Sequence, residues 1–171
     1  MKDTLAMLNR MQADEVIGEY AIGGAVGATY YLEPAATLDV DIFLTLPAAS
    51  GGSLLTLTPI YDYLISRGCT VQGEHIVIGD WPVQFLTPAN PLEQDALAHA
   101  IGAEVEGVPT RVMKAEHLVA IALNTGRPKD FARILQFLEQ GAVNHDELRR
   151  ILAKYGLSEK WERFRQRYLG E

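Results

Sequence analysis

The sequence of 171 residues predicts an α/β (α+β) fold, in which a small mixed sheet with packed helices is followed by a C-terminal helical part. Helical and strand-like patterns alternate up to about residue 113, glycines and prolines separate them, and only helical patterns follow. The composition, with 48% hydrophobic and 22% charged residues, is typical of a globular protein. We therefore expect a mixed core over residues 1–113 and a helical region over residues 114–171 that packs on it.

The first half of the core alternates helices and strands. In chain order, the patterns predict a helix over residues 3–18, a strand over 20–22, a helix over 25–32, a strand over 38–46 and a helix over about 55–67. Pro34 and Gly68 end the second and third of these helices. The strand over 38–46 is the clearest, because apolar residues recur in it at every second position.

The rest of the chain continues with shorter strands and then helices. Strands are expected over residues 75–78 and 82–86, a helix over 91–100, a weak strand pair within 104–113, and helices over 114–125, 128–140, 144–155 and 158–169. A Gly-Asp-Trp turn joins the first two of these strands as a hairpin. Asn144 and Glu147 resemble a capping box at the start of the third C-terminal helix.

Composition excludes several classes of protein. No apolar run approaches the roughly 20 residues needed to cross a bilayer, and the charged N-terminal segment lacks the apolar centre of a signal peptide. The single cysteine, Cys69, rules out an internal disulfide. The four histidines do not share zinc-ligand spacing with one another or with Cys69. We therefore expect a cytoplasmic protein with no membrane partner.

Charge is distributed unevenly along the chain. The net charge of −7 argues against nucleic-acid binding over the whole surface. Residues 144–171, however, contain seven Lys or Arg against five Asp or Glu. Either this segment meets an anionic macromolecule, or its charges cover a solvated helical face.

Two aspartates one residue apart lie in the strand predicted over residues 38–46. Residues i and i+2 of a strand point to the same face, so Asp39 and Asp41 are expected side by side. Two neighbouring carboxylates repel each other unless a cation lies between them. Mg²⁺ prefers oxygen ligands and commonly takes one or two carboxylates together with substrate phosphates. Asp39 and Asp41 are therefore candidate metal ligands; the alternative is the polar face of a half-exposed strand.

A glycine pair follows the strand predicted over residues 20–22. Gly23 and Gly24 allow the backbone to approach a phosphate closely, and the helix that follows would direct its N–H groups at the anion. An ordinary tight turn is the alternative for the glycines alone. Together, the strand, the glycine pair, the helix and the Asp-x-Asp strand predict a phosphate-binding turn beside a metal-binding acid pair.

The segment Ile22–Phe43 resembles the signature of the nucleotidyltransferase superfamily related to DNA polymerase beta. That signature has a hydrophobic residue, Gly-Gly or Gly-Ser, a helix, and then Asp-x-Asp or Asp-x-Glu in a strand; the spacer here, Ala25–Leu38, has 14 residues. The segment Val112–Glu139 is similar to one branch of the superfamily, the AbiEii-type toxins and related uncharacterised bacterial proteins. The resemblance implies a minimal nucleotidyltransferase fold, Mg²⁺, and transfer of a nucleoside monophosphate from an NTP.

The resemblance also implies roles for individual residues. Asp39 and Asp41 would be the catalytic metal ligands, Gly23 and Gly24 would contact phosphate, and Arg127 or Lys129 would neutralise triphosphate charge. Arg127 and Lys129 also have a structural interpretation. Cations near the end of one helix, and an acid such as Asp130 in the first turn of the next, are favoured by the helix dipoles.

Two positions depart from the pattern of the superfamily. Active members usually have a third carboxylate on a nearby strand, where this chain has Gln84, which cannot act as a general base. Asp80, four residues earlier in the predicted turn, is a candidate substitute. Several relatives also carry a lysine near the position of Leu123.

Three functions are therefore compatible with the sequence. The first is an Mg²⁺-dependent nucleotidyltransferase with a toxin-like effect and an unknown acceptor such as tRNA or a protein. Because Gln84 replaces a carboxylate, the second is a catalytically degenerate nucleotide-binding or regulatory protein of the same fold. The third is an interaction protein of a toxin–antitoxin pair, with an antitoxin as its partner.

Overall fold

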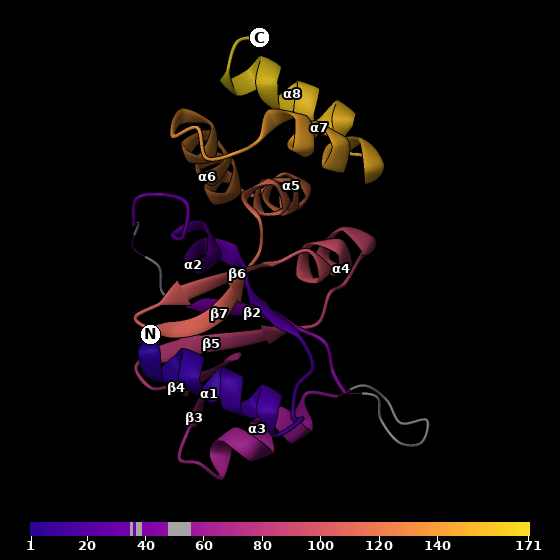
Figure 1. The fold of residues 1–171 in the computed structure, drawn as a ribbon. Coiled ribbons are helices and arrows are strands. Elements are labelled where there is room, and N and C mark those ends of the chain that lie inside the picture. The colour runs from indigo at the N-terminus through magenta and orange to yellow at the C-terminus, as the bar shows by residue number, and fades with distance from the viewer. Residues whose placement is uncertain (35, 37–38, 48–55) are drawn as a thin grey trace.

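The computed structural model describes residues 1–34, 36, 39–47 and 56–171, and its centre is a seven-stranded mixed sheet (Figure 1). The strands are β1 (Tyr20–Ile22), β2 (Val40–Leu44), β3 (Thr70–Gln72), β4 (His75–Ile78), β5 (Trp81–Leu86), β6 (Ile101–Val105) and β7 (Val108–Val112). They lie in the order β3-β4-β5-β2-β1-β7-β6. The β2–β5 and β1–β7 pairs are parallel and the other neighbours are antiparallel. The predicted α/β fold class is confirmed.

Helices cover both faces of the sheet. They are α1 (Lys2–Ala13), α2 (Gly24–Ala28), α3 (Thr58–Ile65), α4 (Pro91–Ala98), α5 (Ala115–Thr125), α6 (Pro128–Glu139), α7 (His145–Lys154) and α8 (Ser158–Tyr168). Helices α1 and α3 pack on one face, while α2, α4 and α5 pack on the other. Helices α6 and α7 pack against α5, and α8 packs against α5 and α7, so the chain ends in a helical layer away from the sheet (Figure 1).

The alternation of side chains along β2 determines where its aspartate points. Ile42 belongs to the buried apolar cluster beneath α1 and α3, whereas Phe43 belongs to the cluster beneath α5. Successive residues of a strand point to opposite faces. Asp41 therefore lies on the same face as Phe43, the face covered by α5.

Several predicted boundaries differ from those of the structure. The first helix ends at Ala13, and Glu15 follows in the left-handed conformation with a φ of 58°, which a continuing helix does not allow. The strand predicted over residues 38–46 is shortened to β2, so that Asp39 comes directly before it. Leu38 and Leu55, at which two of the predicted elements begin, lie outside the described residues.

One strand was not predicted. All three residues of β3 are exposed, and β3 pairs only with β4 at the edge of the sheet. A strand defined by its hydrogen-bonding partner, with no buried side chain, leaves no apolar periodicity in the sequence.

The C-terminal helices agree with the predicted ranges to within one residue at each end. The capping box forms only in part: the side chain of Asn144 accepts hydrogen bonds from the N–H groups of Asp146 and Glu147. The carboxylate of Glu147 instead accepts a hydrogen bond from Lys114 Nζ at 2.9 Å. The N–H of Asn144 donates to Glu116 Oε1 at 2.7 Å. These contacts hold α7 against the start of α5. The boundary between a core over residues 1–113 and a helical region over residues 114–171 stays a prediction.

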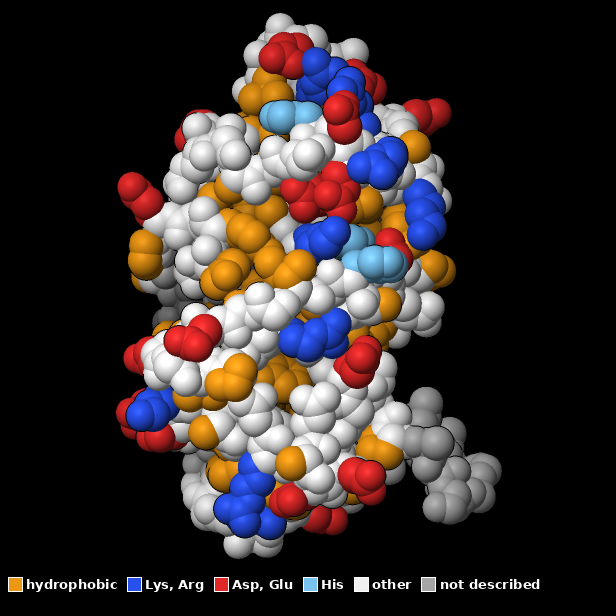
Figure 2. All heavy atoms as spheres, in the orientation of Figure 1, with side chains coloured by type: hydrophobic (Ala, Val, Ile, Leu, Met, Phe, Trp, Pro, Cys, Tyr) orange, Lys and Arg blue, Asp and Glu red, His pale blue; other side chains and the backbone are white. Residues whose placement is uncertain are grey.

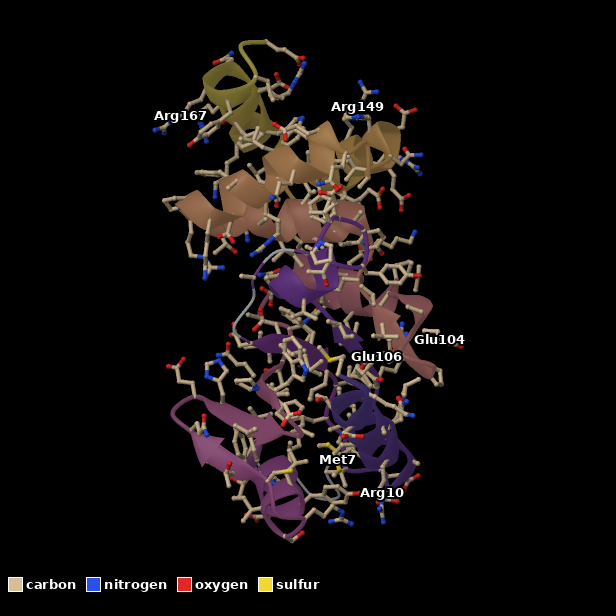
Figure 3. All side chains as sticks on the ribbon, turned by 90° about the vertical axis from the view of Figure 1, so that its left-hand side faces the viewer. Met7, Arg10, Glu104, Glu106, Arg149 and Arg167 are labelled. Atoms are coloured by element: carbon tan, nitrogen blue, oxygen red, sulfur yellow. The ribbon has the colours of Figure 1, made fainter. Side chains whose placement is uncertain are left out.

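Many cations of residues 144–171 lie beside acids. Arg149 pairs with Asp146, Arg163 with Glu159, and Arg165 with Glu162 and Glu171. Lys, Arg, Asp and Glu side chains are intermixed over this end of the molecule (Figure 2), and Arg149 and Arg167 lie at the end opposite α1 (Figure 3). This arrangement favours the solvated-face interpretation of the charges.

No helix in the described part of the chain combines the length and the apolar character needed to cross a membrane.

Candidate functional site

A cavity of about 190 Å³ lies between the sheet and helices α5 and α6, and Asp41 lines it. We call it the Asp41 cavity. The described residues that line it are Gly24, Asp41, Phe43, Gln84, Leu86, Glu93, Met113, Leu118, Ile121, Ala122, Thr125, Arg127, Asp130 and Arg133. Segments that are far apart in the sequence therefore meet at one polar site.

The register of the sheet places three of the predicted site residues next to one another. Asp41 of β2 is the direct partner of Gln84 in the parallel strand β5. On its other side, the backbone oxygen of Asp41 accepts a hydrogen bond of 2.9 Å from the N–H of Gly23. Gln84 therefore lies directly beside Asp41 in the sheet.

Gly24 has no room for a side chain. Its φ is +57°, and a Cβ atom built on it would overlap the carboxylate of Asp41, whose Oδ2 lies closest. At Gly23, an added Cβ would meet the ring of Phe43 at 2.7 Å. The glycine pair therefore lets the turn between β1 and α2 approach Asp41.

Asp39 is placed differently from Asp41. Oδ2 of Asp39 lies 3.1 Å from Nε2 of His75 in β4, and Asp39 is not among the described residues that line the Asp41 cavity. Burial and then the charge of Asp39 raise the pKa of Asp41, whereas Arg133 and Arg127 act to lower it. The two aspartates are thus close enough to repel each other, although only Asp41 faces the cavity.

Arg127 and Lys129, predicted as alternatives, also differ in position. Arg127 lines the Asp41 cavity and is the N-cap residue of α6, where its Nε donates to Asp130 Oδ2 at 2.7 Å. Lys129 is exposed and lines a neighbouring cavity, beside Ala25. Arg127 therefore both caps α6 and lines the Asp41 cavity, so its two interpretations are compatible.

Neither Asp80 nor Leu123 is among the described residues that line the Asp41 cavity. Asp80 is exposed in the turn between β4 and β5, roughly 13 Å from Gln84 at about 3.3 Å per residue along the strand. Leu123 is fully buried, and the residues of α5 that line the cavity are Leu118, Ile121, Ala122 and Thr125. The helix contributes apolar surface and one hydroxyl to the Asp41 cavity.

The sequence interpretation missed three residues. Arg133 lines the cavity one helical turn after Asp130, so both lie on one side of α6. In the sequence alone, Arg133 looks like an ordinary charged residue of an amphipathic helix. Glu93 has the pattern of a capping residue, and its carboxylate does accept a hydrogen bond from the N–H of Ala89 at 2.7 Å. His75 meets Asp39 only through the sheet order, which the pattern did not predict.

The oxygen donors around Asp41 have the chemistry that Mg²⁺ prefers. The carboxylates of Asp39 and Asp41 and the side-chain amide oxygen of Gln84 are hard ligands. Within the described residues, no group of three or more His, Cys, Asp or Glu side chains is arranged to hold a metal ion. The protein donors therefore suit an ion that takes its remaining ligands from phosphate and water.

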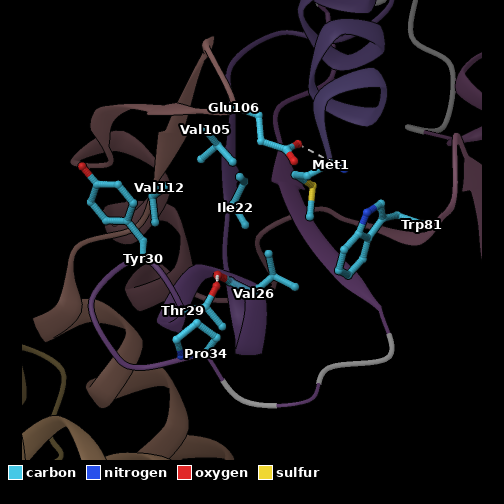
Figure 4. Close-up of a pocket in the computed structure, with 10 residues that line it drawn as sticks. All are labelled: Met1, Ile22, Val26, Thr29, Tyr30, Pro34, Trp81, Val105, Glu106 and Val112. Atoms are coloured by element: carbon cyan, nitrogen blue, oxygen red, sulfur yellow. Dashed lines mark hydrogen bonds and ion pairs between the residues drawn. The ribbon is translucent and has the colours of Figure 1, made fainter.

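A second cavity, of about 440 Å³, lies on the other face of the sheet at β1 and β7 (Figure 4). We call it the apolar cavity. The described residues that line it are Met1, Ile22, Val26, Thr29, Tyr30, Pro34, Trp81, Val105, Glu106 and Val112. Tyr30 and Trp81 lie on opposite sides of it (Figure 4), and its carboxylate, Glu106, is 3.3 Å from the N-terminal ammonium group. This cavity contains none of the predicted site residues.

Comparison with solved structures identifies the fold. An antigenic nucleotidyltransferase-like protein from Paracoccidioides brasiliensis superposes with a TM-score of 0.61 over 93% of this chain and 90% of that protein, at 14% sequence identity. The antibiotic-resistance factor ANT(2'')-Ia superposes with a TM-score of 0.53 over 99% of this chain and 98% of that protein, also at 14% identity.

No protein-family model and no curated protein matches the sequence. The AbiEii-type resemblance therefore depends on the sequence motifs alone. At 14% identity the structural likeness extends to the fold and no further. The chain has the fold of nucleotidyltransferase-like proteins.

Proposed function

We propose that this protein is an Mg²⁺-dependent nucleotidyltransferase, which transfers a nucleoside monophosphate from an NTP to an acceptor. One observation supports the proposal above the others: Gly24, Asp41 and Arg127 line a single cavity. These are a backbone turn suited to phosphate, an acid suited to a metal ion, and a cation suited to negative charge. The nucleotidyltransferase-like fold supports the same conclusion.

Each residue has a role in this proposal. Asp39 and Asp41 would hold Mg²⁺, which when bound neutralises phosphate charge. The backbone of Gly23 and Gly24 would lie against the phosphates, and Arg127 would neutralise their remaining charge. Lys129 lies outside the Asp41 cavity, so the proposal gives it no role in binding.

The size of the Asp41 cavity suggests which part of an NTP it would receive. Its volume of about 190 Å³ is below the roughly 300–1,000 Å³ of typical small-molecule pockets. The triphosphate would therefore enter the cavity, and the nucleoside would lie outside it. An acceptor hydroxyl would attack the α-phosphorus, and pyrophosphate would leave.

Only the sequence resemblance bears on the identity of the acceptor. The resemblance to AbiEii-type proteins supports tRNA or a protein as acceptor, a toxin-like effect and an antitoxin as partner. These remain proposals, and a growth assay on cells that express the chain tests the toxin-like effect.

A second candidate is a nucleotide-binding protein without turnover. Gln84 favours it, because the residue beside Asp41 cannot accept the proton of an attacking hydroxyl. Such a protein would bind an NTP more tightly with Mg²⁺ and would leave it intact.

The test is transfer of label from each of the four α-labelled NTPs to components of a cell extract, with Mg²⁺. We expect transfer by the wild type and a loss of at least about 100-fold for Asp41→Asn, because loss of a metal ligand removes several kcal/mol of stabilisation. Asp80→Asn, which changes an exposed aspartate outside the cavity, is the matched control and should behave as the wild type.

The outcomes separate the candidates. Transfer that is unaffected by Asp41→Asn rejects the assignment of the site. Mg²⁺-dependent binding of an NTP without any transfer supports the second candidate.

A further inference from the structure

A buried carboxylate organises the cationic side of the Asp41 cavity. Asp130, in the first turn of α6, is 1% exposed. It accepts hydrogen bonds from Arg127 Nε at 2.7 Å, from Arg127 Nη2 at 3.1 Å and from the backbone N–H of Arg127 at 3.2 Å. A buried carboxylate is costly unless it is paired and hydrogen-bonded, so these contacts hold the guanidinium of Arg127 in one orientation.

Arg133 approaches the same carboxylate from the next turn of the helix. Its Nη1 lies 3.6 Å from Asp130 Oδ1, and its side chain is only 19% exposed. Both arginines line the cavity, and the charge of each acts to lower the pKa of Asp41. Asp130 therefore lies behind two cations that face Asp41.

The arrangement leaves donors for a ligand. A guanidinium has five N–H donors, and Asp130 accepts side-chain hydrogen bonds from two nitrogens of Arg127. Arginine is suited to phosphate because its planar fork binds two oxygens at once. Two such groups among the residues that line the Asp41 cavity match the charge of a polyphosphate.

We propose that Arg133 binds the triphosphate of the substrate together with Arg127, and that Asp130 is the positioning residue for both. This inference rests on the proposed function, because it names how the same cavity recognises the NTP. Because the two arginines are themselves positively charged, part of the affinity of the site for the triphosphate should not depend on a metal ion.

Lys129 provides a matched control on the same helix. It lies between Arg127 and Arg133 in the sequence, has the same charge, and is exposed beside the neighbouring cavity. A loss of net positive charge on α6 is therefore the same for Lys129→Gln as for Arg133→Gln, but only the second variant removes a donor from the Asp41 cavity.

The test is calorimetric binding of ATP, and separately of inorganic triphosphate, to the full chain with EDTA and then with Mg²⁺. We expect Arg133→Gln to weaken binding of both ligands by about 10-fold to 100-fold, the range for a charge-assisted hydrogen bond. Arg133→Lys keeps the charge but loses the fork, and should fall between Arg133→Gln and the wild type. Lys129→Gln should change affinity by less than about threefold.

Asp130→Asn distinguishes positioning from simple charge. The substitution removes an anion from the cavity, so simple charge predicts tighter binding of polyphosphate. Positioning predicts weaker binding, because neutral Asn holds the two guanidinium groups in place less firmly than the negatively charged Asp130 does. Thermal melting of each variant checks that it folds. If Asp130→Asn does not fold, Asp130→Glu replaces it: it keeps the charge but displaces the carboxylate, so weaker binding supports positioning and unchanged binding overturns it.

Each result has a consequence for the inference. Equal affinity of Arg133→Gln and Lys129→Gln overturns it, and label transfer by the wild type would then still support the proposed function. The predicted order of affinities without any label transfer supports the inference and rejects the catalytic proposal. A wild-type chain that binds neither ligand overturns both.

Discussion

The Asp41 cavity and the apolar cavity lie on opposite faces of the same sheet. Neighbouring residues separate them: Val112 lines the apolar cavity, whereas Met113 lines the Asp41 cavity. The apolar cavity is more than twice as large, at about 440 Å³ against about 190 Å³. The smaller cavity, however, is the one lined by Gln84, Arg127, Asp130 and Arg133.

The smaller of the two cavities thus contains the charged groups on which the proposed function depends. A half-buried carboxylate such as Asp41, whose pKa is raised by partial burial and by a neighbouring acid, is typical of functional sites. The apolar cavity has one carboxylate, Glu106, which is paired with the N-terminal ammonium group. Substitutions at the Asp41 cavity should therefore weaken ligand binding. Substitutions of matched residues away from the cavity serve as controls and should leave binding unchanged.

Among the substitutions that test this comparison of the two faces, Gly24→Ala should have the largest effect. Its Cβ would overlap the carboxylate of Asp41, and its φ of +57° is unfavourable for alanine. We expect affinity for Mg²⁺–ATP to fall by at least about 10-fold and the free energy of unfolding to fall by about 2 kcal/mol or more. Calorimetry and urea denaturation measure the two quantities.

Gly73→Ala is the control for backbone conformation alone. Gly73 lies in the turn between β3 and β4 with a φ of +61°, and an added Cβ would have no atom within 4 Å. We expect a loss of about 1–2 kcal/mol of stability and unchanged binding of ATP. If both alanine variants bind ATP as the wild type does, the contact between Gly24 and Asp41 has no functional meaning.

The sequence predicted the parts of this site that are local. The glycine pair, the two aspartates and the C-terminal helices all follow from spacing and periodicity within a short stretch of chain. Gly24 and Asp41 do come together, because β1 and β2 are neighbouring strands. The roles of these residues stay predictions.

The parts that the sequence did not predict depend on contacts between distant segments. His75 reaches Asp39 through the order of β4, β5 and β2, and Glu93 reaches the cavity from the start of α4. Arg133 looks like any surface arginine of an amphipathic helix until the packing of α6 is known. The edge strand β3 has no buried side chain, so no pattern marked it.

A smaller effect is expected for Gln84→Asp. Asp41 and residue 84 are direct partners in the parallel strands β2 and β5, and a second carboxylate at residue 84 would repel that of Asp41. We expect the melting temperature to fall without metal and to recover with Mg²⁺, which would lie between the carboxylates. Gln84→Asn, which adds no charge, should not gain this response to Mg²⁺. A melting temperature of Gln84→Asp that does not respond to Mg²⁺ would contradict a metal site beside Asp41.

A crystal structure of the chain with Mg²⁺ and a non-hydrolysable NTP analogue tests the central claim most directly. We expect metal density between Asp39 and Asp41, and phosphate density between Asp41 and the guanidinium groups of Arg127 and Arg133. A nucleotide bound in the apolar cavity, or an Asp41 cavity that stays empty at saturating ligand, would contradict it.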